Sequence, residues 1–161
     1  MLTQARLKAL LSYDPVTGEF RWRTTGKGRR ADRRAGAVNG QGYMLIGVDY
    51  ERHPAHRLAW LYMTGTWPPM LDHRDGNKRN NAFANLRICT KSENARNSRR
   101  PAHNSTGLKG VSRSRRSGKF AAFICVAGKN VFLGEFSSAV EAHAAYAAAA
   151  HKHFQSYARL A

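Results

Sequence analysis

Residues 71–87, LDHRDGNKRNNAFANLR, bring a carboxylate, an imidazole and several amides close together in the chain. Asp72 and His73 are adjacent, and asparagines follow at positions 77, 80, 81 and 85. A neutral imidazole can accept a proton at cellular pH, and carboxylate or amide oxygens can bind a divalent cation. Because asparagine is seldom used to fill a core, the stretch is either a solvated loop or an assembled polar site.

The elements around this stretch are predicted to be strand, loop, strand and helix. Residues 71–73 look like a strand, residues 74–81 a polar loop that turns at Asp75-Gly76, and residues 85–90 a second strand. Thr90-Lys-Ser-Glu93 is a capping box, so a helix should follow with Asn94 in its first turn. Neighbouring residues of a regular strand point to opposite faces, so Asp72 and His73 can share a site only where the strand ends irregularly.

The charge of the chain points to a nucleic-acid partner. Its 161 residues contain 27 Lys and Arg against 10 Asp and Glu, a formal net charge of +17. Arginine outnumbers lysine 19 to 8, and its planar guanidinium group suits phosphates and base edges. A ribosomal-type protein and a protein that binds anionic membranes are the alternatives, and no long apolar run or basic amphipathic helix supports the second.

The cysteines and the N-terminus indicate an intracellular protein. Cys89 and Cys125 form no Cys-x-x-Cys pair, so a structural zinc ribbon is excluded and a disulfide framework is not expected. Residues 1–14 look like a short amphipathic helix and not a signal peptide.

The first hundred residues predict helices and short strands. A helix capped by Thr3 should run to about residue 11, and strands are expected at 19–23, 42–48 and 52–55. A buried helix is expected at 56–64. His53 and His56 are three residues apart and could share a metal, but a His56 that is packed or hydrogen-bonded is the simpler interpretation. Residues 27–36 are either a solvated loop or a segment that binds the DNA backbone, through Arg29, Arg30, Arg33 and Arg34.

The remainder of the chain predicts a linker and a βββα unit. Residues 95–107 are almost free of apolar side chains and carry Arg96, Arg99 and Arg100. Strands are expected at 109–113, 119–126 and 130–133, and a Ser138–Glu141 capping box should begin a helix that reaches about residue 154. The predicted fold class is therefore α+β.

HRLAW at 56–60, followed by DH, NN, NL and SEN, resembles the HNH endonucleases, particularly the homing-type branch from phages and introns. LLSYDPVTGEFRW at 10–22 and GYMLIGVD at 42–49 also resemble the lead-in of that branch, and the resemblance covers roughly residues 1–98. The resemblance implies a ββα-metal motif at about 70–98. In this motif His73 is the general base, Asn85 the residue that orients it, and Asp72 and Asn94 the metal ligands.

The resemblance implies metal-dependent hydrolysis of a DNA phosphodiester bond. An amide at position 94 suits Mg²⁺, or alternatively Mn²⁺, better than Zn²⁺. One site per chain implies a nickase that acts as a monomer on double-stranded DNA, with a dimer needed for a double-strand break. The alternatives are a polar surface hairpin, a degenerate site, and a non-catalytic DNA-binding or regulatory protein. RNA binding is disfavoured, because no aromatic pair on a sheet is apparent from the sequence.

GKFAA, LGEF and EAHAAYAAAA, within residues 105–161, resemble the plant ethylene-response-factor (APETALA-type) DNA-binding domain. That resemblance implies a three-stranded sheet in the major groove, with its DNA-facing side chains at Arg113, Arg115, Arg116, Lys119 and Phe132. Phe123, Cys125 and Asn130 depart from the plant pattern. Together the two resemblances predict a nuclease domain at 1–98, a linker at 99–106 and a DNA-binding domain at 107–161.

Overall fold

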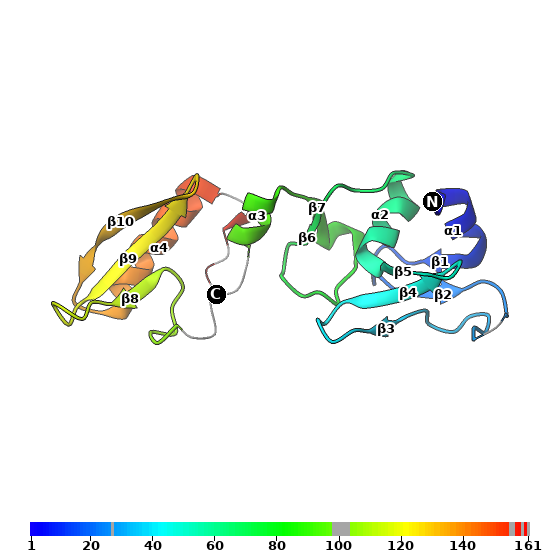
Figure 1. The fold of residues 1–161 in the computed structure, drawn as a ribbon, viewed down its shortest axis with the longest axis horizontal. Helices are drawn as coiled ribbons and strands as arrows, with labels where there is room; N and C mark the ends of the chain where they lie inside the picture. Colours follow the sequence, from blue (N-terminus) through cyan, green and yellow to red (C-terminus); the bar gives the residue numbers. More distant parts are fainter. Residues whose placement is uncertain (27, 98–103, 155–156, 159, 161) are drawn as a thin grey trace. The chain divides into compact units, whose positions relative to one another are not determined.

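A computed structural model describes residues 1–26, 28–97, 104–154, 157, 158 and 160, in two compact units (Figure 1). The units are Met1–Thr90 and Lys91–Ala161, whereas the sequence placed the domain boundary after residue 98. Most of the predicted linker at 99–106 lies outside the described residues. Helices occur together with small antiparallel sheets, which confirms the α+β class. None of the described helices is long and apolar enough to span a membrane.

Helix α1, Gln4–Leu10, opens the first unit and leads directly into strand β1, Leu11–Tyr13. The Thr3 hydroxyl accepts a hydrogen bond from the Arg6 backbone N–H, as the predicted cap requires. Strand β1 pairs antiparallel with β2, Phe20–Trp22.

The basic segment after β2 is held against that strand by backbone hydrogen bonds. The Trp22 N–H donates to the Arg33 carbonyl at 3.0 Å, and the Asp32 N–H donates to the Trp22 carbonyl at 2.8 Å. The Ala35 N–H donates to the Phe20 carbonyl, also at 2.8 Å. These hydrogen bonds hold the backbone of residues 32–35 against β2, and with it the backbone of Arg33 and Arg34.

A three-stranded sheet and a helix complete the scaffold of the first unit. The sheet contains β3 (Ala37–Val38), β4 (Met44–Val48) and β5 (Glu51–Pro54), in the order β3-β4-β5. Helix α2, Ala55–Thr64, follows β5 and ends at Gly65, whose φ of +77° is the left-handed conformation that glycine adopts easily. The core that α2 closes consists mainly of buried aliphatic side chains, among them Leu7, Leu11, Ile46, Leu58 and Leu61.

The predicted strand–loop–strand is confirmed, with a change at the start of its second strand. Strand β6, Leu71–His73, pairs antiparallel with β7, Leu86–Ile88. Asn85 does not open β7 but ends a short 3₁₀ helix, η1, Phe83–Asn85. The long polar connection and this helix turn make β6–β7 a wide hairpin.

The second unit contains the predicted βββα arrangement. Its elements are α3 (Lys91–Arg96), β8 (Val111–Arg113), β9 (Phe120–Val126), β10 (Lys129–Phe136) and α4 (Ala139–Phe154). Strand β9 lies between β8 and β10. Ser138 and Glu141 make the reciprocal hydrogen bonds of a capping box, each at 3.2 Å. Helix α4 packs on one face of the sheet, with Tyr146 and Ala150 against Ile124.

Candidate active site

The register of the β6–β7 hairpin separates Asp72 from its neighbour His73. Asp72 lies opposite Arg87 and His73 lies opposite Leu86, so the two side chains leave the strand on opposite faces. The Arg87 guanidinium donates to Asp72 Oδ2 from Nη2 at 2.8 Å and from Nε at 3.1 Å. Both side chains are buried, and the charge of the Asp72 carboxylate is therefore balanced inside the protein.

The asparagine side chain that lies beside the ring of His73 is Asn81. Its Nε2 lies 3.3 Å from Asn81 Oδ1, and the Asn81 amide nitrogen donates to the Arg79 carbonyl at 3.2 Å. Because the amide nitrogen has this partner, its oxygen faces the ring, and the tautomer that completes this hydrogen bond donates through Nε2. The basic atom of His73 is then Nδ1. The Tyr13 hydroxyl donates to the Asn81 backbone carbonyl at 2.7 Å, which fixes this loop on β1.

A second histidine and a tyrosine contact the ring of His73. The ring centroids of His56 and His73 are 5.0 Å apart with an interplanar angle of 71°, and Tyr43 lies 5.4 Å from His56 and 6.3 Å from His73. His73 is only 5% exposed, and burial lowers its pKa although the hydrogen bond to Asn81 opposes the shift. Burial, followed by the nearby His73 and Arg57, lowers the pKa of His56 to about 3. Both rings are therefore neutral at cellular pH.

Acid should destabilise the protein through His56. Its pKa is lower in the folded than in the unfolded chain, so its contribution is fully present above about pH 6.5 and is lost as the pH falls toward about 3. We expect the free energy of unfolding to fall less steeply for His56→Gln than for the wild type, by up to about 1.4 kcal/mol per pH unit. Urea unfolding followed by tryptophan fluorescence between pH 4 and 8 measures this difference, and parallel curves would contradict it.

The asparagines after His73 form a hydrogen-bonded loop around Asp75. Asn85 accepts from the Asp75 backbone N–H at 3.1 Å and donates to Asp75 Oδ1 at 3.0 Å and to the Asn80 carbonyl at 2.8 Å. Asn80 donates to Asp75 Oδ2, and the Asn77 backbone N–H donates to Oδ1, each at 2.7 Å. Although burial raises the pKa of Asp75, these hydrogen bonds outweigh it and the pKa is lowered. The described hydrogen bonds of Asn85 thus lie within the loop.

The other predicted site residues fall in different places. Asn94 is exposed on α3 of the second unit, whereas Asp72 belongs to the first unit. Arg99 and Arg100 lie outside the described residues, as does the side chain of Arg96. Among the described residues, no three His, Cys, Asp or Glu side chains are grouped closely enough to hold a metal ion.

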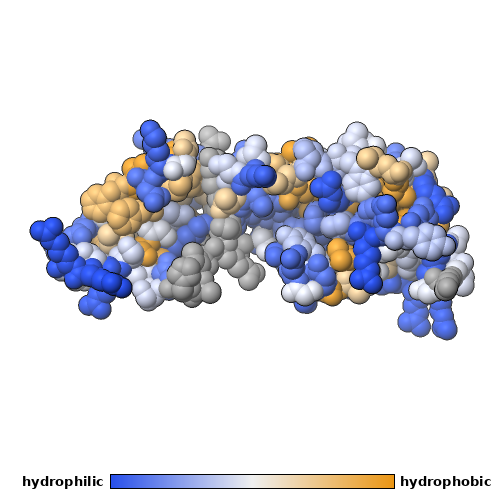
Figure 2. All heavy atoms as spheres, in the orientation of Figure 1, coloured by the Kyte–Doolittle hydropathy of each residue, from blue (hydrophilic) through white to orange (hydrophobic). Residues whose placement is uncertain are grey.

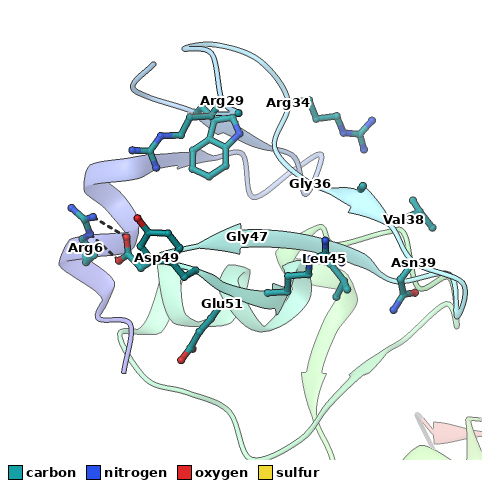
Figure 3. Close-up of a pocket in the computed structure, with 15 residues that line it drawn as sticks. Arg6, Arg29, Arg34, Gly36, Val38, Asn39, Leu45, Gly47, Asp49 and Glu51 are labelled. Carbon is teal, nitrogen blue, oxygen red and sulfur yellow. Dashed lines mark hydrogen bonds and ion pairs between the residues drawn. The ribbon is translucent and has the colours of Figure 1, made fainter. Parts of the chain in front are cut away.

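The four arginines predicted to bind the DNA backbone surround one recess of the first unit. Arg29, Arg30, Arg33 and Arg34 line a depression of about 520 Å³, with Arg29 lying 5.2 Å over the Trp22 ring. A larger groove of about 840 Å³ continues across β3–β5 and is lined by Arg6, Arg29, Arg34 and Arg52 (Figure 3). Two acidic residues, Asp49 and Glu51, also line it, and Figure 3 shows Asp49 joined to Arg6. The groove therefore keeps an excess of positive charge.

In the second unit, the residues predicted to face DNA are all exposed. Arg115, Arg116 and Lys119 lie in the connection from β8 to β9 or at its end. The register pairs Arg113 with Phe120, on the side of the sheet that carries Val111, and its Nε donates to the Gly118 carbonyl at 3.4 Å. Phe132 is 57% exposed on β10, so it does not pack in the core.

Comparison with known proteins identifies the class to which this site belongs. Residues 53–96 match a family model described as HNH endonuclease, and this range contains α2, the β6–β7 hairpin and α3. The chain therefore belongs to the HNH endonuclease family. It is also similar to Protein 3.8 of Escherichia phage T7, with 34% identity over 82 residues that cover 50% of this chain and 68% of the phage protein. No solved structure matches the chain significantly.

Three residues of the site were not assigned a role from the sequence. Arg87 could have been found from register, because a hairpin that pairs residue 71 with residue 88 places Arg87 opposite Asp72. Asn81 was noticed as part of the asparagine cluster, but only the path of the loop shows that it reaches His73. His56 was read as a packed histidine, and its packing partner is His73 itself.

Proposed function

We propose that the chain is a metal-dependent DNA endonuclease of homing type that nicks one strand per binding event, with His73 as general base. One observation carries the proposal. Within a domain of the HNH endonuclease family, the buried ring of His73 lies 3.3 Å from the Asn81 amide oxygen, which sets Nδ1 as its basic atom. A neutral, oriented imidazole is the state that a general base requires.

In the proposed reaction, His73 activates a water molecule. Nδ1 takes one proton as the water oxygen forms a bond to phosphorus, and the bond from phosphorus to the 3′ oxygen breaks. The 3′ oxygen leaves and takes a proton from solvent, which gives a 5′ phosphate and a 3′ hydroxyl group. Hydrogen bonding by Asn81 keeps the tautomer fixed while this happens, and the rings of His56 and Tyr43 limit rotation of the imidazole.

The sequence resemblance assigns a divalent ion to Asp72 and Asn94. Their oxygens are hard donors of the kind that Mg²⁺ and Mn²⁺ prefer, and the ion would neutralise charge that develops on the phosphate. Because Arg87 already balances the Asp72 carboxylate, the protein alone offers little net negative charge. DNA phosphate oxygens would complete the ligand set, as is usual for Mg²⁺. The oxygen donors suit such an ion by type, but the Asp72 carboxylate is buried against Arg87 and leaves β6 on the face opposite His73, so it does not point to the side of the proposed base.

Replacing Asn94 by alanine should raise the Mg²⁺ concentration for half-maximal nicking by at least about tenfold, because one oxygen donor is lost. Because Asn94 is exposed on α3, the variant should fold as the wild type does, and Ser92→Ala on the same helix is the matched control. Nicking rates measured across a Mg²⁺ titration give the result. An unchanged Mg²⁺ requirement would remove Asn94 from the site.

The roles of the two asparagines near His73 can be separated. Asn81→Ala should slow single-turnover nicking by about 10- to 100-fold, because the base loses its orienting acceptor. Asn85→Ala should chiefly lower the thermal midpoint, because the hydrogen-bonded loop around Asp75 loses three contacts. Greater slowing by Asn85→Ala, with no loss of thermal stability, would return the orienting role to Asn85 as first predicted.

Double-stranded DNA is the proposed partner of both units. The recess formed by Arg29, Arg30, Arg33 and Arg34 offers backbone contacts in the first unit, and the arginines at 96, 99 and 100 would add to them. The second unit, similar in sequence to ethylene-response-factor domains, would supply site preference. A DNA substrate agrees with an intracellular location.

Product analysis tests the nicking activity. Supercoiled plasmid incubated with Mg²⁺ and excess protein should yield relaxed circles well before linear DNA, because each chain has one site. Linear DNA that appears at the same rate as relaxed circles would indicate a dimer that cuts both strands. Plasmid that is retarded on a gel yet stays supercoiled would favour the alternative, a non-catalytic DNA-binding protein.

A further inference from the structure

The face of the β8–β9–β10 sheet that α4 leaves uncovered carries an aromatic pair. Ala122 and Ile124 of β9 point toward α4, so the alternate residues Phe123 and Cys125 point to the outer face. Phe123 lies opposite Phe132 of β10, with ring centroids 5.3 Å apart. Phe123 is 40% exposed and Phe132 is 57% exposed. Figure 2 shows an apolar area over β9 and β10.

The pair lies in the middle of the outer face, and the neighbouring pairs are not basic. Cys125 lies opposite Asn130 on one side, and Ala121 lies opposite Glu135 on the other. The positive charges stand around the edge instead. They are Arg115, Arg116 and Lys119 in the connection before β9 and Lys129 at the turn into β10. An apolar centre bordered by positive charges fits a partner that has an apolar group at its centre and negative charges along its borders.

The major groove of DNA has that pattern. It admits a two-stranded antiparallel ribbon and is bordered by phosphates on both sides, which the basic rim would meet. The only apolar group that projects into the groove is the C5 methyl group of thymine. The Asn130 amide, exposed beside the aromatic pair, has the donor and acceptor that adenine presents in the same groove.

We propose that Phe123 and Phe132 contact thymine methyl groups in the major groove, so that the second unit selects A·T over G·C base pairs. The proposal rests on the DNA-binding function proposed above and adds its base preference. Arginine, the usual reader of guanine, is missing from the paired positions 121–125 and 130–135 of β9 and β10. The selection therefore comes from apolar contact, with Asn130 as its polar complement.

Stacking on unpaired bases is the competing use of such a pair. The two rings are tilted by 49° to one another, so they offer no common flat surface on which successive bases could stack. A methyl group, in contrast, fits against two tilted rings. The experiment below separates the two uses, because leucine can contact a methyl group but cannot stack.

The test compares binding of the full-length protein to poly(dA-dT) and poly(dA-dU) duplexes at one salt concentration. These polymers have the same minor-groove groups and differ by the thymine methyl group alone. Wild type should bind the uracil polymer at least about fourfold more weakly, the effect of one buried methyl group. Phe123→Ala and Phe132→Ala should each bind the two polymers equally. Phe132→Leu should keep the difference between them. Val140 is exposed on α4, and Val140→Ala should behave as the wild type does.

Circular dichroism and the thermal midpoint show whether each variant is folded. We expect folded variants, because both phenylalanines are exposed. Equal binding of both polymers by the wild type would overturn the inference while leaving the nuclease proposal intact. The same holds if the alanine variants keep the preference, or if they lose affinity for single-stranded oligo(dT) and not for duplex. Failure of the wild type to bind any duplex would overturn the inference and the proposed function together.

Discussion

His73→Ala should lower the single-turnover rate of DNA nicking by about 10²- to 10⁴-fold, the contribution of a general base. The variant loses the atom that takes the proton from water, so the loss should appear in the chemical step. DNA affinity should stay within about twofold of wild type, because the phosphate contacts proposed here come from arginines elsewhere in the chain. Rapid-mixing cleavage assays and fluorescence anisotropy measure the two quantities.

Two further variants guard this result against a folding defect. His73→Gln nearly preserves the volume of the buried side chain and should be as inactive as His73→Ala. His53→Ala is the matched control, since His53 lies 3.6 Å from exposed Glu51 and packs 5.5 Å from Trp67. It should cut at close to the wild-type rate. An equal loss of binding and cutting in His73→Gln would contradict the role of His73 as a base.

Arg87→Met should lower the free energy of unfolding by about 3–5 kcal/mol, because it leaves the buried Asp72 carboxylate without its partner. Much of this loss should return in the double variant Arg87→Met with Asp72→Leu, in which no charge stays buried. Urea titration of each variant, analysed as a double-mutant cycle, gives the interaction free energy.

An exposed ion pair of the same unit provides the comparison. Arg6 donates to both Asp49 oxygens, at 2.8 and 3.0 Å, but both side chains are exposed. Water screens such a pair, so Arg6→Met should lower the free energy of unfolding far less than Arg87→Met does. Similar losses for Arg6→Met and Arg87→Met would show that the Asp72–Arg87 pair is not isolated from solvent.

Local signals in the sequence were enough for most of the fold. The Thr3 cap and the Ser138–Glu141 capping box marked helix starts that the structure confirms, because a cap depends on residues three or four positions apart. The last strand was predicted to stop at residue 133, but β10 continues to Phe136. Gly134, with a φ of +135°, occurs at a register shift and not at the strand end.

The candidate site was harder to predict, because it depends on contacts between distant residues. Adjacent Asp72 and His73 were expected to share one site, yet a regular antiparallel register sends Asp72 to Arg87 and His73 toward Asn81. The family resemblance assigned the orienting role to Asn85, and that role stays a prediction for the Asn81 and Asn85 variants to test. The aromatic pair on the outer sheet face was also missed, since Phe123 and Phe132 meet only through the β9–β10 register.

The most direct test of the nuclease proposal is the conversion of supercoiled plasmid by metal-stripped wild-type protein, followed over time with and without added Mg²⁺. Relaxed circles should accumulate only after Mg²⁺ is added, should stop accumulating when a chelator is added, and should carry 5′ phosphate ends at the nick. Plasmid that is fully bound yet remains supercoiled at every Mg²⁺ and Mn²⁺ concentration would contradict the proposal and leave a DNA-binding protein without nuclease activity.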